Sequence, residues 1–375
     1  MIKKIIFWIL ISLVTISSVY ANESVIDNVA EDLELEEVLD ALEEFSDDTI
    51  DVESTVKKLI TGNGTDYGKI GNYILEKLLY EVKLGIKSAA TILVIIILMA
   101  LIKGLELEKD NNLSNVTNLV GFLIIATIML KSYLVMIKLF VDTIQLLTQI
   151  MQVISPFMLA ILIATGEITT SGIIGPVLMF VTSLIGIIVT YVIVPLLSLS
   201  LVFKIITNIS ENIKLDNFSS LFSSASMWII SVIFALFLGV LELESTVTTS
   251  VDEITIKTTQ AAVSNLVPVV GKFVSDSIEV VMGASQVIGK AVGVVGIMVM
   301  VLMALVPIIK LIIYNIIYFI AACFSELLNV DSKITKLLEN ISKQYKTMMG
   351  IMLGVMITFI IGIAIVINLM GKVIS

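Results

Sequence analysis

From residue 88 onward the chain is a series of long apolar blocks separated by short polar stretches. The whole sequence is 57% hydrophobic and 15% charged, whereas soluble domains are about half apolar and a quarter charged. In the hydrocarbon core of a bilayer no water pairs with the backbone, so a spanning segment must be a helix or part of a closed barrel. Blocks of this length favour helices. We therefore predict an all-α, polytopic integral membrane protein.

The lengths of the blocks are uneven. A crossing needs about 20 apolar residues, so block 153–165 is short, while blocks 172–206 and 291–324 are long and contain prolines. These features predict broken or re-entrant helices, whose freed backbone groups must be satisfied by protein or by water in a cavity. We expect about six crossings in a transmembrane domain over residues 88–375. The blocks are residues 88–102, 116–137, 153–165, 172–206, 223–241, 291–324 and 347–370.

The first residues are typical of a signal peptide. Two lysines precede an apolar run over residues 5–14, and Val19 and Ala21 supply the small residues of a secretory cleavage site. We therefore predict a signal peptide over residues 1–21. The alternative is an uncleaved first anchor, although the run is short for a bilayer span. Both alternatives place the residues that follow outside the cytoplasm.

Residues 22–87 carry most of the charge of the chain. They contain 17 acidic residues against six lysines, a net charge of −11, whereas the whole chain has −10. An acidic surface repels the phosphates of nucleic acids, so we expect no nucleic-acid partner. Apolar residues recur every three or four positions, which predicts exported amphipathic helices. Their apolar sides either bury one another in a small cap or form a docking surface for a protein partner.

Lysine alone sets the expected orientation, because the chain contains no arginine. With an exported amino terminus and about six crossings, residues 103–115, 204–222 and 325–346 fall in the cytoplasm. The last of these stretches is the richest in lysine, as the positive-inside rule requires. The long segment near residues 242–290 is then an exported loop.

The residues that most enzymes use are missing. The sequence has no histidine, so it offers no Ser-His-Asp or Cys-His relay and no imidazole ligand for zinc. Its single cysteine, Cys323, forms no intramolecular disulfide. No Walker A, GxGxxG, CxxC or EF-hand pattern occurs. We therefore expect no catalytic residues, no metal site and no cofactor, and the protein is predicted not to be an enzyme.

One polar pattern lies within the apolar region. Asp142, Gln145, Gln149 and Gln152 follow one another at spacings of three, four and three, which places them on one helix face. Polar and ionisable residues inside a membrane are candidates for function because they are costly to place there. We predict that these four residues face a pore. The alternative is a helix lying in the membrane interface with its polar side in water.

Glycines recur at helical spacing near the start of two apolar blocks. Gly289 and Gly293 form one small-xxx-small pair, and Gly350 and Gly354 form another. Such pairs allow helices to approach closely in a membrane. We expect these glycines to mediate helix packing, either within one chain or between subunits.

The most distinctive sequence runs from residue 257 to residue 311, and it resembles the corresponding region of the stage III sporulation protein AE family. The resemblance extends to most of the chain, including the sequence LFLGVLEL at residues 236–243 and the last apolar block. It is weakest over residues 22–87. The matching elements are a turn with Pro268, Gly271 and Lys272, the step Gly283, Ala284 and Ser285, a glycine-rich start of the next span, and Pro307.

The resemblance implies a role that no motif reveals. Family members are polytopic components of a secretion-like channel complex that joins the mother cell to the forespore and is required for endospore development. The implied partners are the lipid bilayer, the other stage III A sporulation proteins, stage II sporulation protein Q and a separate ATPase subunit. The implied location is the mother-cell membrane around the forespore. The alternatives are a self-sufficient secondary permease for a small solute and a scaffold without a conduit.

Overall fold

The computed structural model describes residues 23–46, 51–61, 67–105, 111–209, 215–240 and 270–370. The expected signal peptide over residues 1–21 lies outside these ranges. Within them the regular structure is entirely helical, without a strand. Six helices are long and apolar enough to cross a membrane. The prediction of an all-α, polytopic membrane protein is therefore confirmed.

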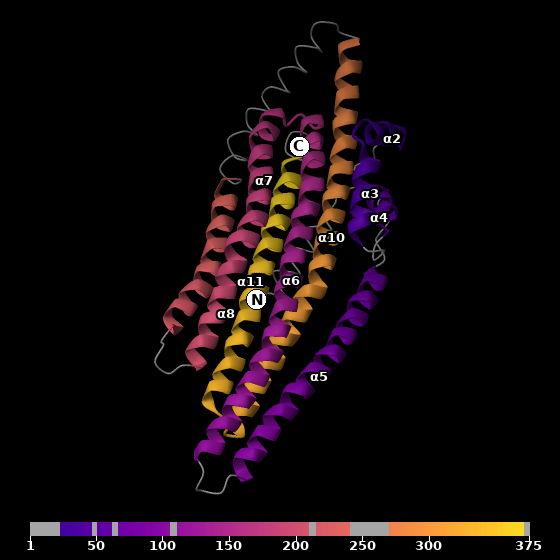
Figure 1. Ribbon diagram of the computed structural model, residues 1–375. Helices are drawn as coiled ribbons and strands as arrows, with labels where there is room; N and C mark the ends of the chain where they lie inside the picture. The colour runs from indigo at the N-terminus through magenta and orange to yellow at the C-terminus, as the bar shows by residue number, and fades with distance from the viewer. Residues whose placement is uncertain are drawn as a thin grey trace.

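Six long helical segments run side by side and alternate in direction (Figure 1). The ends of α5, α8 and α10, which precede the three stretches expected in the cytoplasm, lie at one end of the bundle. The reversal between α6 and α7 lies at the other end. The segments are α5 (Tyr67–Leu105), α6 (Asn111–Ala164), α7 (Ile168–Ile188) continued by a π-helical turn η1 (Val189–Ile193) and α8 (Val194–Ile209), the helix Asp216–Val240, α10 (Val270–Leu327) and α11 (Ser332–Leu369).

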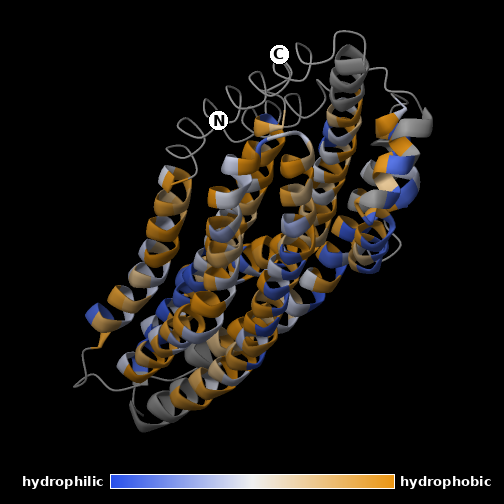
Figure 2. Cartoon of the chain, turned by 90° about the horizontal axis from the view of Figure 1, so that it is seen from above, coloured by the Kyte–Doolittle hydropathy of each residue, from blue (hydrophilic) through white to orange (hydrophobic). Residues whose placement is uncertain are grey.

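Helix α10 is the central element of the bundle. In its most apolar stretch 67% of the residues are buried, against 22% for α5 and 17% for the helix Asp216–Val240. It packs against α11 along most of its length and also contacts α5, α6 and the short amino-terminal helices. Helices α5, α6, α7, α8 and the helix Asp216–Val240 expose apolar side chains, and hydrophobic residues occur along much of their length (Figure 2). That surface is suited to lipid.

The prolines do not break these helices. Helix α6 continues through Pro156, α7 through Pro176 and α10 through Pro307, because neighbouring helices and local adjustments satisfy the freed backbone groups in a membrane bundle. The interruption in block 172–206 is the single π-helical turn η1, which directly precedes the segment containing Pro195. Block 153–165 is the last part of α6 and not a separate segment. The chain then reverses at residues 165–167.

Two expected boundaries differ from the structure. Residues 270–290 of the expected exported loop form the first part of α10, because they contain no proline and their apolar residues recur at helical spacing. Residues 241–269 lie outside the described residues. The expected boundary between Lys87 and Ser88 falls inside α5, which continues from the acidic region into the apolar block without a break. Charge changes along this helix while the backbone hydrogen bonding does not.

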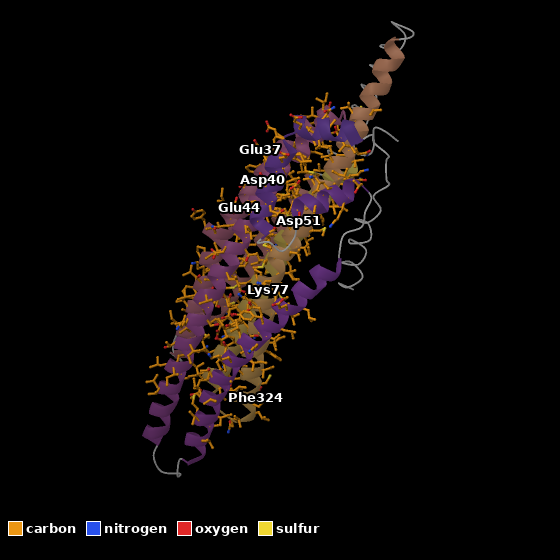
Figure 3. The ribbon with its side chains drawn as sticks, turned by 90° about the vertical axis from the view of Figure 1, so that its right-hand side faces the viewer. Glu37, Asp40, Glu44, Asp51, Lys77 and Phe324 are labelled. Carbon is orange, nitrogen blue, oxygen red and sulfur yellow. The ribbon has the colours of Figure 1, made fainter. Side chains whose placement is uncertain are left out.

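Three short helices precede the bundle: α2 (Glu23–Asp32), α3 (Leu35–Ser46) and α4 (Val52–Ile60). Their apolar sides are buried, with Leu42 and Val52 fully inaccessible to solvent. All three contact α10, and α3 also contacts α6. Figure 3 labels the acidic side chains Glu37, Asp40 and Glu44 along α3, and all three are exposed. The acidic side therefore faces solvent while the apolar side packs on the bundle.

Two carboxylates fix the start of α4. The Asp51 carboxylate accepts a hydrogen bond of 2.8 Å from the backbone N–H of Ser54, which is a helix N-cap. This hydrogen bond holds the pKa of Asp51 below its usual value. The Glu43 carboxylate on α3 accepts a second bond of 2.7 Å from the backbone N–H of Val52. The second bond joins α3 to α4 across their short connection.

Glycines allow α6 and α11 to approach α10 closely. A Cβ atom added at Gly293 would lie 2.6 Å from Cδ1 of Ile367 on α11 and 3.2 Å from Cε of Met158 on α6. At Gly289 it would lie 2.5 Å from Cγ2 of Ile161. These distances are shorter than van der Waals contact, so a larger residue would push the helices apart.

We predict that Gly293→Ala lowers the stability of the folded chain by about 1–3 kcal/mol through overpacking. Gly354→Ala on α11 is the matched control, because an added Cβ there meets nothing within 4 Å. Both changes raise intrinsic helix propensity by the same amount, so the difference between them reports packing. Thermal unfolding in detergent measures it. Equal midpoints for the two variants would contradict the prediction.

A largely buried ion pair joins α5 to α10. Lys310 Nζ lies 3.1 Å from Glu81 Oε1, and the exposed fractions of the two side chains are 30% and 7%. Removing one partner of a fully buried pair costs roughly 3–5 kcal/mol because the other charge is left unpaired. The partial exposure of Lys310 reduces that cost.

We predict that Lys310→Glu destabilises the α5–α10 contact by about 2 kcal/mol, since it places two acids together at a site shielded from water. The double variant Glu81→Lys with Lys310→Glu restores most of the loss. The matched control is Lys57→Glu in the exposed pair with Glu53 on α4, where the expected effect is below about 1 kcal/mol. Thermal midpoints of the four proteins test this. Failure of the double variant to recover would show that the ion pair is not the cause.

Candidate functional site: a polar stripe on helix α6

The four polar residues singled out in the sequence lie together on one exposed face of α6. Asp142, Gln145, Gln149 and Gln152 are all exposed, and so is Lys138 one turn before Asp142. Every other residue of α6 between Lys138 and Gln152 is buried or half-buried. We call these five residues the α6 polar stripe. Over 14 residue steps it is about 21 Å long.

The stripe is narrow and has apolar edges. At 100° per residue its five positions fall within an arc of about 80°. Leu139, Leu146 and Val153 recur at intervals of seven along one edge, and Val141 lies on the other edge. All four are half-buried. The stripe is therefore a single line of polar side chains between apolar shoulders.

Neighbouring contacts place the stripe at the depth of the apolar spans. Thr148, next to Gln149, packs at Gly186 of α7, where an added Cβ would lie 3.3 Å from its Cγ2 atom. Ile154, two residues beyond Gln152, packs at Gly296 of α10. Both glycines belong to spans that are long and apolar enough to cross a membrane. The polar stripe thus lies beside segments that are long and apolar enough to span a membrane.

This position limits which neighbours the charged and polar side chains of the stripe can have. A lysine or aspartate facing lipid at the centre of a span costs about 2.5–3.5 kcal/mol, so water or another protein is the favourable neighbour. Helix α6 runs along the bundle and contacts α7, α10 and α11 on its other sides. These contacts show that α6 is packed within the bundle.

The remaining residues predicted from sequence are spread over the bundle. Gly271 and Lys272 lie in the first turn of α10, and Pro268 falls outside the described residues. Gly350 faces Met227 of the helix Asp216–Val240, with an added Cβ 3.1 Å from Cε of that methionine, while nothing lies near Gly354. Among the described residues there is no group of three or more acidic or cysteine side chains placed to hold a metal ion.

A layer of polar side chains that could not be identified from the sequence crosses the bundle, and we call it the polar layer. On α6 it lies before the stripe, toward the amino end of the helix. Tyr345 on α11 is fully buried and shares a hydrogen bond of 2.8 Å with Ser132 on α6. Asn315 on α10 donates to the backbone oxygen of Ser342 over 2.7 Å. The layer consists of Ser132, Ser200, Lys204, Ser219, Asn315, Asn340, Ser342, Gln344 and Tyr345.

The polar layer fixes the register of five helices. Gln344 Nε2 donates to Ser200 Oγ over 2.8 Å, and Lys204 Nζ donates to Asn340 Oδ1 over 2.9 Å, both between α8 and α11. Ser219 on the helix Asp216–Val240 donates to the backbone oxygen of Ser200 over 2.6 Å. Most of these polar groups bond to one another, although Oε1 of Gln344 has no hydrogen-bond partner among the described residues. The layer therefore holds the helices together, whereas the stripe is a separate polar surface that is exposed.

Known proteins match this chain over most of its length. The family described as stage III sporulation protein AE matches residues 50–370. A relative from Bacillus subtilis (strain 168), named stage III sporulation protein AE, is 24% identical over 292 residues, which cover 78% of this chain and 73% of the relative. No solved structure matches. The family match includes all six membrane-spanning helices and the α6 polar stripe, and on this ground the chain belongs to the stage III sporulation protein AE family.

Proposed function

We propose that this chain is a non-catalytic membrane component of a secretion-like channel complex between the mother cell and the forespore, and that the α6 polar stripe borders its water-filled path. Membership of the family implies involvement in sporulation. The observation that carries the more specific proposal is the stripe itself. Five exposed polar residues at the depth of the apolar spans require a neighbour other than lipid.

The location of the stripe favours a component of a complex over a self-sufficient permease. Secondary permeases bind their solute inside one chain, near the midplane, where unwound helices line the site. Here α6 is helical throughout, and its polar residues lie on the outer surface of the chain. A path that uses this surface needs a second wall from outside the chain.

The proposed orientation places α2, α3 and α4 on the exported side, in the space between the two membranes. The ends of α8 and α10 and the start of α11 then lie in the mother-cell cytoplasm, where exposed Lys336, Lys343 and Lys346 satisfy the positive-inside rule. Proposed partners are the other stage III A proteins, stage II sporulation protein Q on the exported side, and a separate ATPase subunit. The last supplies energy that a chain without a nucleotide-binding motif does not.

We predict that Gln149→Leu and Asp142→Asn each lower the yield of heat-resistant spores at least tenfold in the spore-forming host, because each reduces the hydration of the path. Protein levels remain unchanged, since both side chains are exposed. The matched control is Phe180→Leu on α7, an exposed position that faces lipid in this proposal. Normal sporulation of both stripe variants would show that the stripe does not border a functional path.

Accessibility of introduced cysteines tests the orientation. In a Cys323→Ser background, Glu37→Cys on α3 should react in intact vegetative cells with a thiol reagent that does not cross the bilayer. Lys336→Cys on α11 should react only after permeabilisation. Both positions are exposed, and the thiolate forms readily only in water. The reverse pattern would invert the proposed orientation and place α2–α4 in the cytoplasm.

A further inference from the structure

We propose that further copies of this chain form the second wall of the path, with their α6 polar stripes arranged in parallel around a common axis. This inference rests on the proposed function of the stripe. One stripe about 80° wide borders a path but does not enclose it. All copies share one orientation in the membrane, so their stripes lie at the same depth and face the same axis.

The shoulders of the stripe suit contact between copies. Polar positions recur at intervals of four and three residues from Lys138 to Gln152, and Leu139, Leu146 and Val153 recur at intervals of seven beside them. The three apolar residues return to the same side of the helix every two turns, so they are placed to pack along a neighbouring helix. With the polar line toward the axis, the half-buried apolar edges meet the neighbouring copies. The same helix face thus supplies both a wetted surface and a packing surface.

Charge along the stripe is complementary between copies in the same orientation. Lys138 and Asp142 are one helical turn apart, and neither forms an ion pair with another residue in the described part of the chain. The rise between them is about 6 Å, a distance that the flexible lysine side chain covers. In a parallel arrangement Lys138 of one copy therefore reaches Asp142 of the next. A ring of such pairs relieves the repulsion between like charges at each level.

The apolar span of α6 is longer than a bilayer is thick, which favours a protein neighbour along part of it. Its span Leu119–Ala164 has 46 residues, or about 69 Å, more than twice the hydrocarbon thickness of about 30 Å. Exposed Leu119, Leu123 and Leu134 continue the same helix below the stripe. One flat bilayer does not cover this length, whereas association of copies along α6 does.

Cross-linking in membranes tests the arrangement. In a Cys323→Ser background, Gln149→Cys should form covalent dimers with a short reagent that joins two thiols, because equivalent residues face each other across the axis. Phe180→Cys on α7 is the matched control, since it is 65% exposed and faces lipid in the proposed assembly. We expect at least a fivefold higher dimer yield at Gln149. Equal yields at the two positions would overturn the proposal.

Charge exchange between chains provides a second measurement. Lys138→Asp alone and Asp142→Lys alone each place like charges on all facing stripes, so each should lower the Gln149→Cys dimer yield at least fivefold. Co-expression of the two variants, distinguished by tags, should restore mixed dimers to at least half the original yield. Each variant keeps its own internal repulsion, so recovery on mixing requires contact between chains.

The outcomes separate this inference from the proposed function. In one outcome the Gln149→Leu variant loses spores, but the protein has a monomeric native mass in detergent and Gln149→Cys forms no dimers. This result supports the path and overturns its formation by copies of this chain. A cross-link from Gln149→Cys to a chain of different mass assigns the second wall to another protein, and it likewise overturns the inference. Dimers at Gln149 with normal sporulation support the assembly and overturn the proposed path.

Discussion

Much of this structure depends on the relation between helix length and bilayer thickness. The apolar spans in α6 and α10 have 46 and 48 residues, about 70 Å each, whereas the hydrocarbon core is about 30 Å thick. Lipid therefore covers only part of each helix. Helix α10 is largely covered by the rest of the chain, since 67% of the residues in its most apolar stretch are buried. In the most apolar stretch of α6 only 44% of the residues are buried. The exposed face of α6 is polar over the length of the stripe.

The central position of α10 follows from three kinds of contact. Glycines on the first half remove side chains where Ile161 and Ile367 approach. In the middle, Lys310 pairs with Glu81 and attaches α5, the helix that continues from the acidic region. Toward the far end, Asn315 connects to Ser342 in the polar layer. Each contact is of a type that works without a hydrophobic driving force, as packing between helices in lipid requires.

The class of fold was predictable from sequence because apolar block length and backbone hydrogen bonding act locally. The lengths and boundaries of individual helices were less predictable from sequence. Prolines at positions 176, 195 and 307 suggested breaks, but whether a helix continues through proline depends on neighbours that a single sequence does not place. The boundary expected after Lys87 lies inside α5, because a change in charge along this helix does not interrupt its hydrogen bonds.

The candidate site likewise has a part that local spacing predicts and a part that depends on contacts between distant residues. Spacing placed Asp142, Gln145, Gln149 and Gln152 on one face, and a helical backbone preserves that relation whatever surrounds it. Lys138 lies on the same face, one turn before Asp142, but was not among the four predicted residues. The polar layer could not be found from sequence because its partners are far apart in the chain, with Ser132 and Tyr345 separated by 213 positions.

The polar layer and the α6 polar stripe differ in how their hydrogen-bonding capacity is used. In the polar layer side chains from five helices bond to one another, so the layer stabilises the bundle. The α6 polar stripe keeps its side chains exposed beside apolar spans, where lipid would be an unfavourable neighbour. A chain without histidine, arginine or a metal-binding group in its described part has few means of catalysis. The stripe is thus the feature that supports the proposed path, which other molecules would complete from outside the chain.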